Sequence, residues 1–160
     1  MAVAELYIKR IKIAASDIIE NEGVRLLEFA LFKENSRDII RIYIYDKDGV
    51  KIKTCASIAK QLNRFIEEEE MLIDNFSVEV SSPGIDYKLK DLTHYELYSG
   101  KTVKVKFINA VDAIKAGTAV MSFDDELHIH FKFTSENDKI VTTEFNNIRK
   151  CKINEQIKFK

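Results

Sequence analysis

Apolar and polar side chains alternate with two different periods in the first half of the chain, and each period predicts a different element. Over residues 3–21 the apolar side chains recur every three or four positions, which is typical of an amphipathic helix, and Gly23 is a natural stop for it. Residues 24–33 and 39–45 are apolar runs separated by a short polar link, which predicts a hairpin of two strands. An Asp-Gly turn over 46–49 follows the second strand.

A second amphipathic segment starts near Thr54, which we expect to be the N-cap of a helix. Its apolar positions keep helical spacing up to Ile66, and the acidic run 67–70 is expected to be a solvated helix end. Apolar and polar residues alternate over 75–81, which predicts a third strand. The order helix, strand, strand, helix, strand predicts a small α/β layer with its helices on one face of a three-stranded sheet.

The second half predicts strands almost throughout. A short helical connection is expected over 89–99, ending at Gly100, and apolar and polar side chains then alternate in five short segments. Five short strands within about sixty residues indicate a small closed β-barrel of SH3-like or Sm-like size. The predicted strands cover 103–107, 117–123, 127–133, 140–145 and 149–153.

The clearest break in the pattern is Ser82-Pro83-Gly84, which holds the only proline and one of the five glycines. Pro83 fixes its own φ and pushes Ser82 out of the helical region, and Gly84 tolerates a positive φ. We therefore predict a domain boundary here, within an α+β fold. The predicted parts are an N-terminal α/β domain over 1–84, a linker with a short helix over 85–100, and a C-terminal barrel domain over 101–160.

Composition is that of an ordinary soluble protein, with 46% hydrophobic and 32% charged residues. No apolar run is long enough to span a bilayer, and the first residues do not form a signal peptide, so we expect a cytoplasmic protein with no membrane partner. Cys55 and Cys151 are then expected to be reduced. Residues 1–86 carry a net charge of −4 and residues 87–160 a net charge of +3, which suggests a different partner for each half.

Side chains capable of catalysis or metal binding occur, but without the companions that such chemistry needs. His128 and His130 point the same way on a predicted strand, yet no Cys or acid at a paired spacing completes a metal site. Ser81 and Ser82 lack a Gly-x-Ser-x-Gly frame, so we expect their hydroxyls to bond backbone groups of the turn, and Asp86 to bond linker amides. We predict no enzyme activity, no cofactor, no metal and no small-molecule substrate.

A short basic row is expected on one face of the barrel, at Lys104 and Lys106, with Lys101 and Lys132 extending it. Lysines beside aromatic rings suit an RNA phosphate backbone or a ribosomal protein surface. A solvated strand face is the alternative explanation of the same pattern.

Several segments, in order, carry a resemblance to a known family. IIRIYIYDKDGV is followed by a helix opening with Thr54-Cys55-Ala56, then by VEVSSPGID and by GKTVKVKF. Over essentially the whole chain this resembles the ribosome maturation factor RimP family. The most specific part is Ser-Ser-Pro-Gly followed by an aliphatic residue and an aspartate. The candidate binding residues in and after this motif are Ser81, Ser82, Pro83, Gly84, Asp86, Lys88 and Lys90.

The resemblance implies a KH-like first layer, an SH3-like barrel, and a monomer that binds the immature small (30S) ribosomal subunit. Its implied partners are 16S rRNA and the decoding-centre ribosomal protein. The family usually has Arg-Pro where this chain has Tyr87-Lys88, so Lys88 or Lys90 would replace the arginine's charge but not its planar fork. Two other hypotheses remain open: an Sm-like regulator that binds single-stranded RNA, and a hydrolase that uses Ser81 or Ser82.

Overall fold

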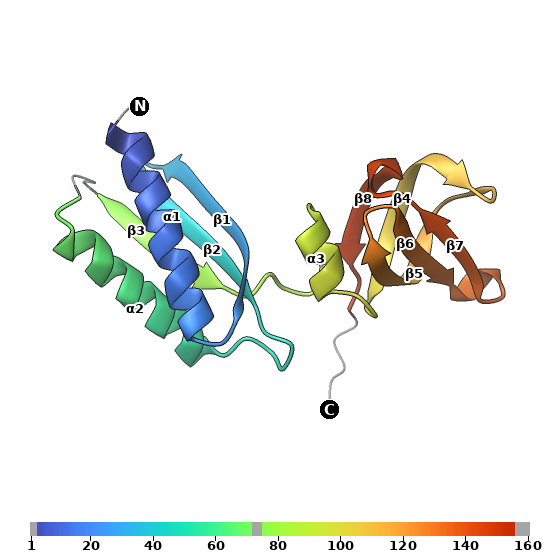
Figure 1. Ribbon diagram of the computed structural model, residues 1–160, viewed down its shortest axis with the longest axis horizontal. Helices are drawn as coiled ribbons and strands as arrows, with labels where there is room; N and C mark the ends of the chain where they lie inside the picture. The colour runs from blue at the N-terminus through green and yellow to red at the C-terminus, as the bar shows by residue number, and fades with distance from the viewer. Residues whose placement is uncertain (1–2, 72–74, 156–160) are drawn as a thin grey trace. The chain divides into compact units, whose positions relative to one another are not determined.

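The structure is a computed structural model and describes residues 3–71 and 75–155 (Figure 1). Its chain divides into two compact units, Met1–Pro83 and Gly84–Lys160. The division falls between the proline and the glycine of the Ser-Ser-Pro-Gly motif. Within the described residues, no helix has the length and apolar character needed to cross a membrane.

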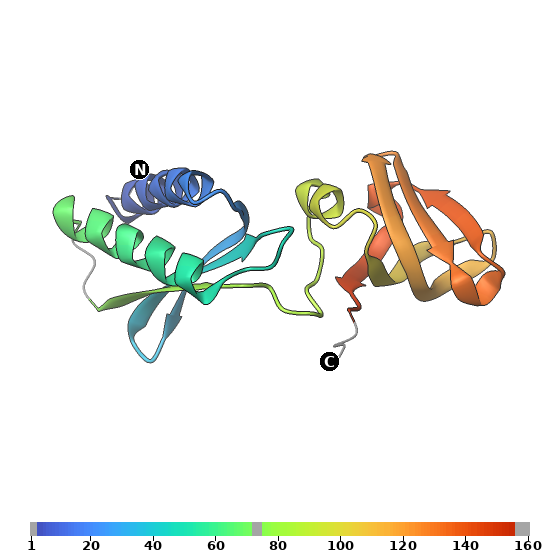
Figure 2. The ribbon, with the colours of Figure 1, turned by 90° about the horizontal axis from the view of Figure 1, so that it is seen from below.

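The first unit has the predicted order of elements. They are α1 (Val3–Asn21), β1 (Arg25–Glu34), β2 (Arg37–Tyr45), α2 (Ile52–Glu68) and β3 (Phe76–Ser81). The central strand β2 pairs antiparallel with β1 and parallel with β3, so the sheet is mixed. Both helices lie on the same face of this sheet (Figure 2).

The core of the first unit lies between that sheet face and the two helices. Alternate residues of β2, Ile40, Ile42 and Ile44, are at most 2% exposed. They pack in one buried cluster with residues such as Ile11 of α1 and Leu62 of α2. Full burial of each such side chain stabilises the fold by about 1.5–3 kcal/mol, so this alternation is what sets the register of β2.

The expectation that Thr54 caps α2 was wrong. The helix begins at Ile52, and Lys51 is the extended N-cap residue, with φ −93° and ψ 139° and no side-chain capping bond. Ile52 is 90% exposed, so the first turn contributes nothing to the core. A boundary placed by apolar periodicity therefore falls too late in the chain.

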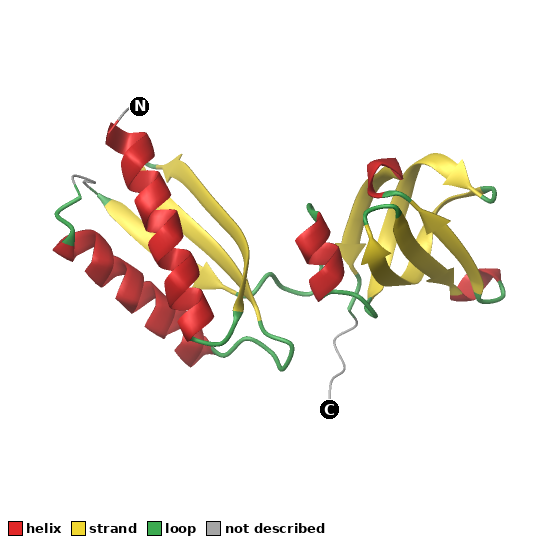
Figure 3. Cartoon of the chain, viewed as in Figure 1, coloured by secondary structure: helices red, strands yellow, loops and turns green. Residues whose placement is uncertain are grey.

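The second unit consists mainly of antiparallel strands (Figure 3). Its elements are α3 (Leu92–Leu97), β4 (Thr102–Val111), β5 (Ile114–Asp125), β6 (His128–Phe133), β7 (Lys139–Thr143) and β8 (Ile148–Ile153), with 3-10 turns at Thr134–Glu136 and Phe145–Asn147. The five strands form one sheet in the order β7-β6-β5-β4-β8. Because β7 and β8 are the edges of this sheet among the described residues, the hydrogen-bonded ring of a closed barrel is not formed.

Three phenylalanines form the centre of this unit. Phe107, Phe131 and Phe133 are at most 1% exposed, and the rings of Phe107 and Phe131 meet edge to face with centroids 5.4 Å apart. Alternate residues on the same strands point outward, as the sequence pattern predicts.

The β4–β5 hairpin is longer than predicted. Its strands run on to Val111 and back from Ile114, past the predicted limits 107 and 117. The turn between them uses Asp112 and Ala113, which adopt left-handed φ values of 48° and 70°. Asp-Ala is not one of the usual residue pairs for such a turn, so the sequence offers no signal there.

The segment predicted to be a linker, 85–100, packs on the second unit. Tyr87 and Leu89 are 7% and 4% exposed. The short helix α3 is capped by Asp91, whose Oδ1 accepts a 3.1 Å hydrogen bond from the backbone N–H of His94. Burial of the aromatic side chains of α3 makes this segment part of the core of the second unit rather than a free connection.

Candidate functional site

The Ser-Ser-Pro-Gly motif follows directly from β3. Ser81 is the last residue of that strand and pairs with Tyr43 of β2. In the described part of the chain, Ser81, Ser82 and Asp86 make no side-chain hydrogen bond, so the bonds expected from them to the backbone were wrong. Ser81, Ser82 and Asp86 are all exposed instead.

The position of Gly84 favours glycine because of its backbone conformation and not because space is short. Its φ is +81°, and a Cβ built on it would touch only the Oδ1 atom of Asp86, at an ordinary 3.8 Å. A side chain would therefore fit in space, but the left-handed backbone would strain any L-residue there.

After the motif, the chain runs antiparallel to β8. The Leu89 N–H donates to the Cys151 carbonyl at 2.8 Å, and the Ile153 N–H donates to the Tyr87 carbonyl at 2.8 Å. Between these two bonds Lys88 lies directly opposite Lys152. The strand-like segment thereby adds one more exposed lysine to the edge of the sheet at β8.

Tyr87 is an anchor for this segment. Its ring meets those of His94 and Tyr98 at centroid distances of 5.4 Å and 6.5 Å. The ammonium group of Lys90 lies 6.0 Å from the centre of the same ring. Lys88 is thus exposed beside β8, while Lys90 is placed over an aromatic ring of the core.

The four lysines of the predicted basic row do not lie together. Lys104 and Lys106 are exposed on the outer face of β4, as expected. Lys132 is exposed on β6, which is separated from β4 by β5. Lys101 precedes β4 and its Nζ lies 3.5 Å from a carboxylate oxygen of Glu155. The row therefore does not extend toward Lys101 or Lys132.

The neighbours of Lys104 and Lys106 come from β8, and they were not predicted from the sequence. Lys104 lies opposite Lys152, and Lys106 lies opposite Lys150. The available signal was the alternation Lys-Cys-Lys-Ile in β8. Only the antiparallel pairing of β8 with β4 brings these lysines beside Lys104 and Lys106.

Aromatic rings, which we expected beside the lysines, lie on the inner side of the sheet. Phe107 on β4 is fully buried, and the outer-face residues of β5 opposite Lys104 and Lys106 are Thr118 and Ala116. As far as residues 75–155 define it, the exposed face therefore offers positive charge and small side chains, without a platform for stacked bases.

The two histidines of β6 bond acids of the preceding hairpin. The Nδ1 atom of His128 lies 2.8 Å from Asp125 Oδ1, and the Nε2 atom of His130 lies 3.0 Å from Asp124 Oδ2. The bond from His128 and then the backbone N–H of Leu127 hold the pKa of the Asp125 carboxyl below its ordinary value. In the described ranges, no group of three or more potential metal ligands is present.

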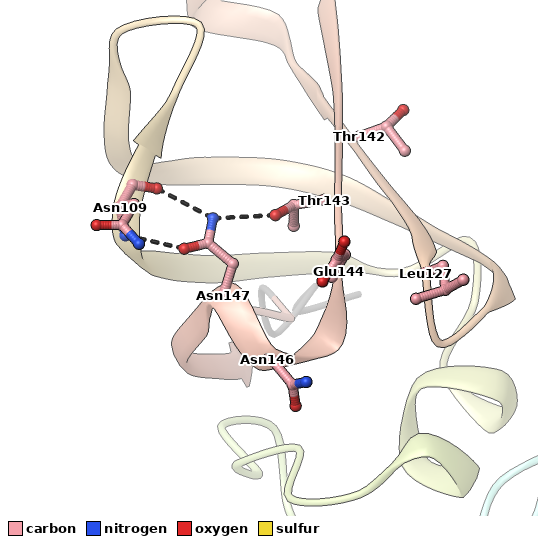
Figure 4. Close-up of a pocket in the computed structure, with 7 residues that line it drawn as sticks. All are labelled: Asn109, Leu127, Thr142, Thr143, Glu144, Asn146 and Asn147. Carbon is pink, nitrogen blue, oxygen red and sulfur yellow. Dashed lines mark hydrogen bonds between the residues drawn. The ribbon is translucent and has the colours of Figure 1, made fainter.

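A shallow pocket of about 540 Å³ opens beside β7 (Figure 4). Asn147 spans it: its Nδ2 donates to the Asn109 carbonyl and to Thr143 Oγ1, both at 3.0 Å, and its Oδ1 accepts from the Asn109 N–H at 2.9 Å. The side-chain amide of Asn147 therefore holds the 3-10 turn to β4. The residues that line the pocket include no titratable pair suited to acid–base catalysis.

Neither cysteine is placed for nucleophilic chemistry. Burial raises the pKa of the Cys151 thiol to about 12, even though a hydrogen bond with Tyr95 opposes the shift. Burial also raises the pKa of the half-buried Cys55. Both thiols are therefore neutral near pH 7.

Two of the four acids in the predicted run 67–70 form ion pairs within the first unit. Arg10 of α1 forms an ion pair with Glu69, and Arg64 donates a 2.7 Å bond to Glu68 one helical turn away. These exposed pairs fasten the end of α2.

The two units define a class of protein: an α/β domain followed by a β domain, whose candidate site is an exposed charged face rather than a catalytic cleft. Residues 14–86 match the family model described as the RimP N-terminal domain. The matched range starts within α1 and ends at Asp86, after the Ser-Ser-Pro-Gly motif. Over these residues the chain is similar to the RimP family, a family of ribosome maturation factors, and the predicted resemblance is confirmed for this part of the chain.

Proposed function

We propose that this protein is a maturation factor that binds the immature small (30S) ribosomal subunit and promotes its assembly by binding alone. The observation that carries the proposal is the match of residues 14–86 to the RimP N-terminal domain. The order of elements in the first unit agrees with it. Such a factor works in the cytoplasm as a monomer, without cofactor or small-molecule substrate.

Two surfaces divide the task in this proposal. The net charge of −4 over residues 1–86 suits a basic ribosomal protein, such as the one at the decoding centre. The lysines of the second unit suit 16S rRNA. We further propose that the five-stranded sheet is a member of the SH3-like barrel class, which its meander β4 to β7 and the return of β8 to β4 support.

Co-sedimentation tests this function. The purified protein is centrifuged at moderate salt with small subunits, large subunits and assembled ribosomes, each in separate tubes. Selective pelleting with free small subunits is the expected result. Equal pelleting with all three particles, or with none, would contradict the proposal.

An Sm-like regulator of single-stranded RNA is the second candidate, and the strand order β7-β6-β5-β4-β8 is the observation that favours it. That candidate requires ring-shaped oligomers and tight binding to short single-stranded RNA. Sedimentation equilibrium separates the two candidates, because the maturation factor is expected to remain a monomer at every concentration tested.

A further inference from the structure

Five lysines of the second unit lie side by side on one outer face, which we call the lysine face: Lys88, Lys104, Lys106, Lys150 and Lys152. Cross-strand pairing places Lys152 between Lys88 on one side and Lys104 on the other. Lys150 and Lys106 form the next row. Side chains that lie directly opposite in an antiparallel pair have Cβ atoms about 4.5–5.5 Å apart, so the five ammonium groups share one patch.

This arrangement is unfavourable for the protein alone. Like charges directly opposite each other on a sheet destabilise it. Within the described residues, none of these five lysines forms an ion pair. Some exposed cations elsewhere do have acids beside them, as Arg41 has Glu79 at 2.9 Å and Lys101 has Glu155. Asp86, two residues before Lys88, is exposed and makes no side-chain bond to them.

The chemistry of the patch selects its ligand. Lysine is a compact point charge that binds phosphate without the planar geometry that base recognition by arginine uses. The small residues Ala116 and Thr118 beside the rows let a polymer backbone approach closely, and among the described residues no aromatic ring is exposed there for base stacking. A row of repeated negative charges, rather than a single anion, matches a surface with five separate cations.

We propose that the lysine face is a docking surface for the phosphate backbone of RNA, without preference for base sequence. This deepens the proposed function, on which it rests for the identity of the RNA, since 16S rRNA is the RNA that such a factor would meet. It also assigns a task to Lys88, which its pairing with Lys152 places on this face.

Salt dependence of RNA binding tests the proposal. The probe is a fluorescent single-stranded uridine homopolymer, and its affinity for the full chain is measured by anisotropy over a salt series. Each phosphate contact to a single strand contributes about 0.7 to the slope of log K against log salt. The triple variant Lys104→Gln, Lys150→Gln, Lys152→Gln should reduce the slope by about 2, which corresponds to roughly a 100-fold loss at 0.1 M salt if the lines converge near 1 M.

Two controls accompany the test variant: one removes a single lysine from the same sheet, and the other matches the full change of three charges. Lys132→Gln removes an exposed lysine from the same sheet, two strands from β4, and should leave the slope nearly unchanged. A triple variant at Lys9, Lys12 and Lys60, all exposed in the first unit, changes the net charge equally. The triple variant of the lysine face should also melt at the same or a slightly higher temperature, because it relieves repulsion, and this shows that it is folded.

An unchanged slope in the lysine-face variant, or an equal reduction in the matched triple control, would overturn the proposal. The proposal would also be overturned if the wild-type protein did not bind the RNA probe while the lysine-face variant lost its co-sedimentation with small subunits. The ligand of the lysine face would then be an acidic protein surface. Failure of the proposed function is distinguishable: the wild-type protein would then fail to pellet selectively with small subunits, whatever the RNA slope.

Discussion

Replacing Phe131 with alanine should destabilise the second unit and leave the stability of the first unit unchanged. Phe131 is fully buried, and its ring lies 5.4 Å from that of Phe107 and 6.5 Å from that of Phe133. Truncation of a buried phenylalanine costs about 3–5 kcal/mol. A unit of this size has a total stability of about 4–12 kcal/mol, so the loss is a large fraction of it.

Hydrogen exchange measured by NMR on the full chain reports each unit separately. Amides of β4, β5 and β6 should exchange roughly 100- to 4,000-fold faster in the Phe131→Ala variant, because 1.4 kcal/mol corresponds to a factor of ten. Amides of β1 and β2 should keep their protection. Phe131→Leu retains most of the apolar volume and loses mainly the ring contacts, which are worth about 0.5–1.5 kcal/mol per pair.

Ile42→Ala is the matched control, since Ile42 is fully buried in the cluster of the first unit. It should cost about 2–5 kcal/mol and raise exchange in β1 and β2 only. The reasoning fails if either substitution accelerates exchange equally in both units, because the two cores would then behave as one.

Three further predictions concern single residues. Gly84→Ala should cost about 1–2 kcal/mol in urea unfolding, through its φ of +81°, and Gly84→Asn should cost less because asparagine tolerates that backbone; equal stabilities would contradict this. Cys151 should resist a thiol reagent in the native protein and react at once in denaturant, and rapid labelling of the native protein would refute this. Because burial raises the pKa of that thiol from 9.0 to about 12, the native state should also lose stability as pH rises from 9 toward 12. His128→Ala should raise the pKa of Asp125 in an NMR titration, and the stability that this lowered pKa confers is present above its unfolded value and lost as pH falls through the folded one; an unmoved Asp125 pKa would assign the shift to the Leu127 amide instead.

Much of the fold follows from local periodicity. Alternation of apolar residues identifies β2 and β6, since Ile42 and Phe131 must both be buried for any packed sheet to form. The ends of helices and strands are marked by weaker signals in the sequence than their centres are. The exposed first turn at Ile52 and the Asp112–Ala113 turn have no apolar or turn-residue signal, so the predicted ends of their elements were displaced.

The candidate site was predicted only in part, because its residues are joined by pairing between distant strands. Lys104 and Lys106 alternate with buried residues and are visible as a row in the sequence. Their partners Lys150 and Lys152 are set by the return of β8 to β4, and local patterns carry no information on that register. The predicted extension to Lys132 failed for the same reason.

The pairing of β8 with β4 also affects when the lysine face comes into existence during folding. The hairpins from β4 to β7 join neighbours in the chain, whereas Val103 pairs with Ile153 across most of the unit. Such a distant closure has the larger entropic cost and forms late. A chain that is partly synthesised or partly folded has only Lys104 and Lys106 in place. The complete surface therefore appears only with the last strand, so an immature copy would lack most of the surface that we propose for RNA.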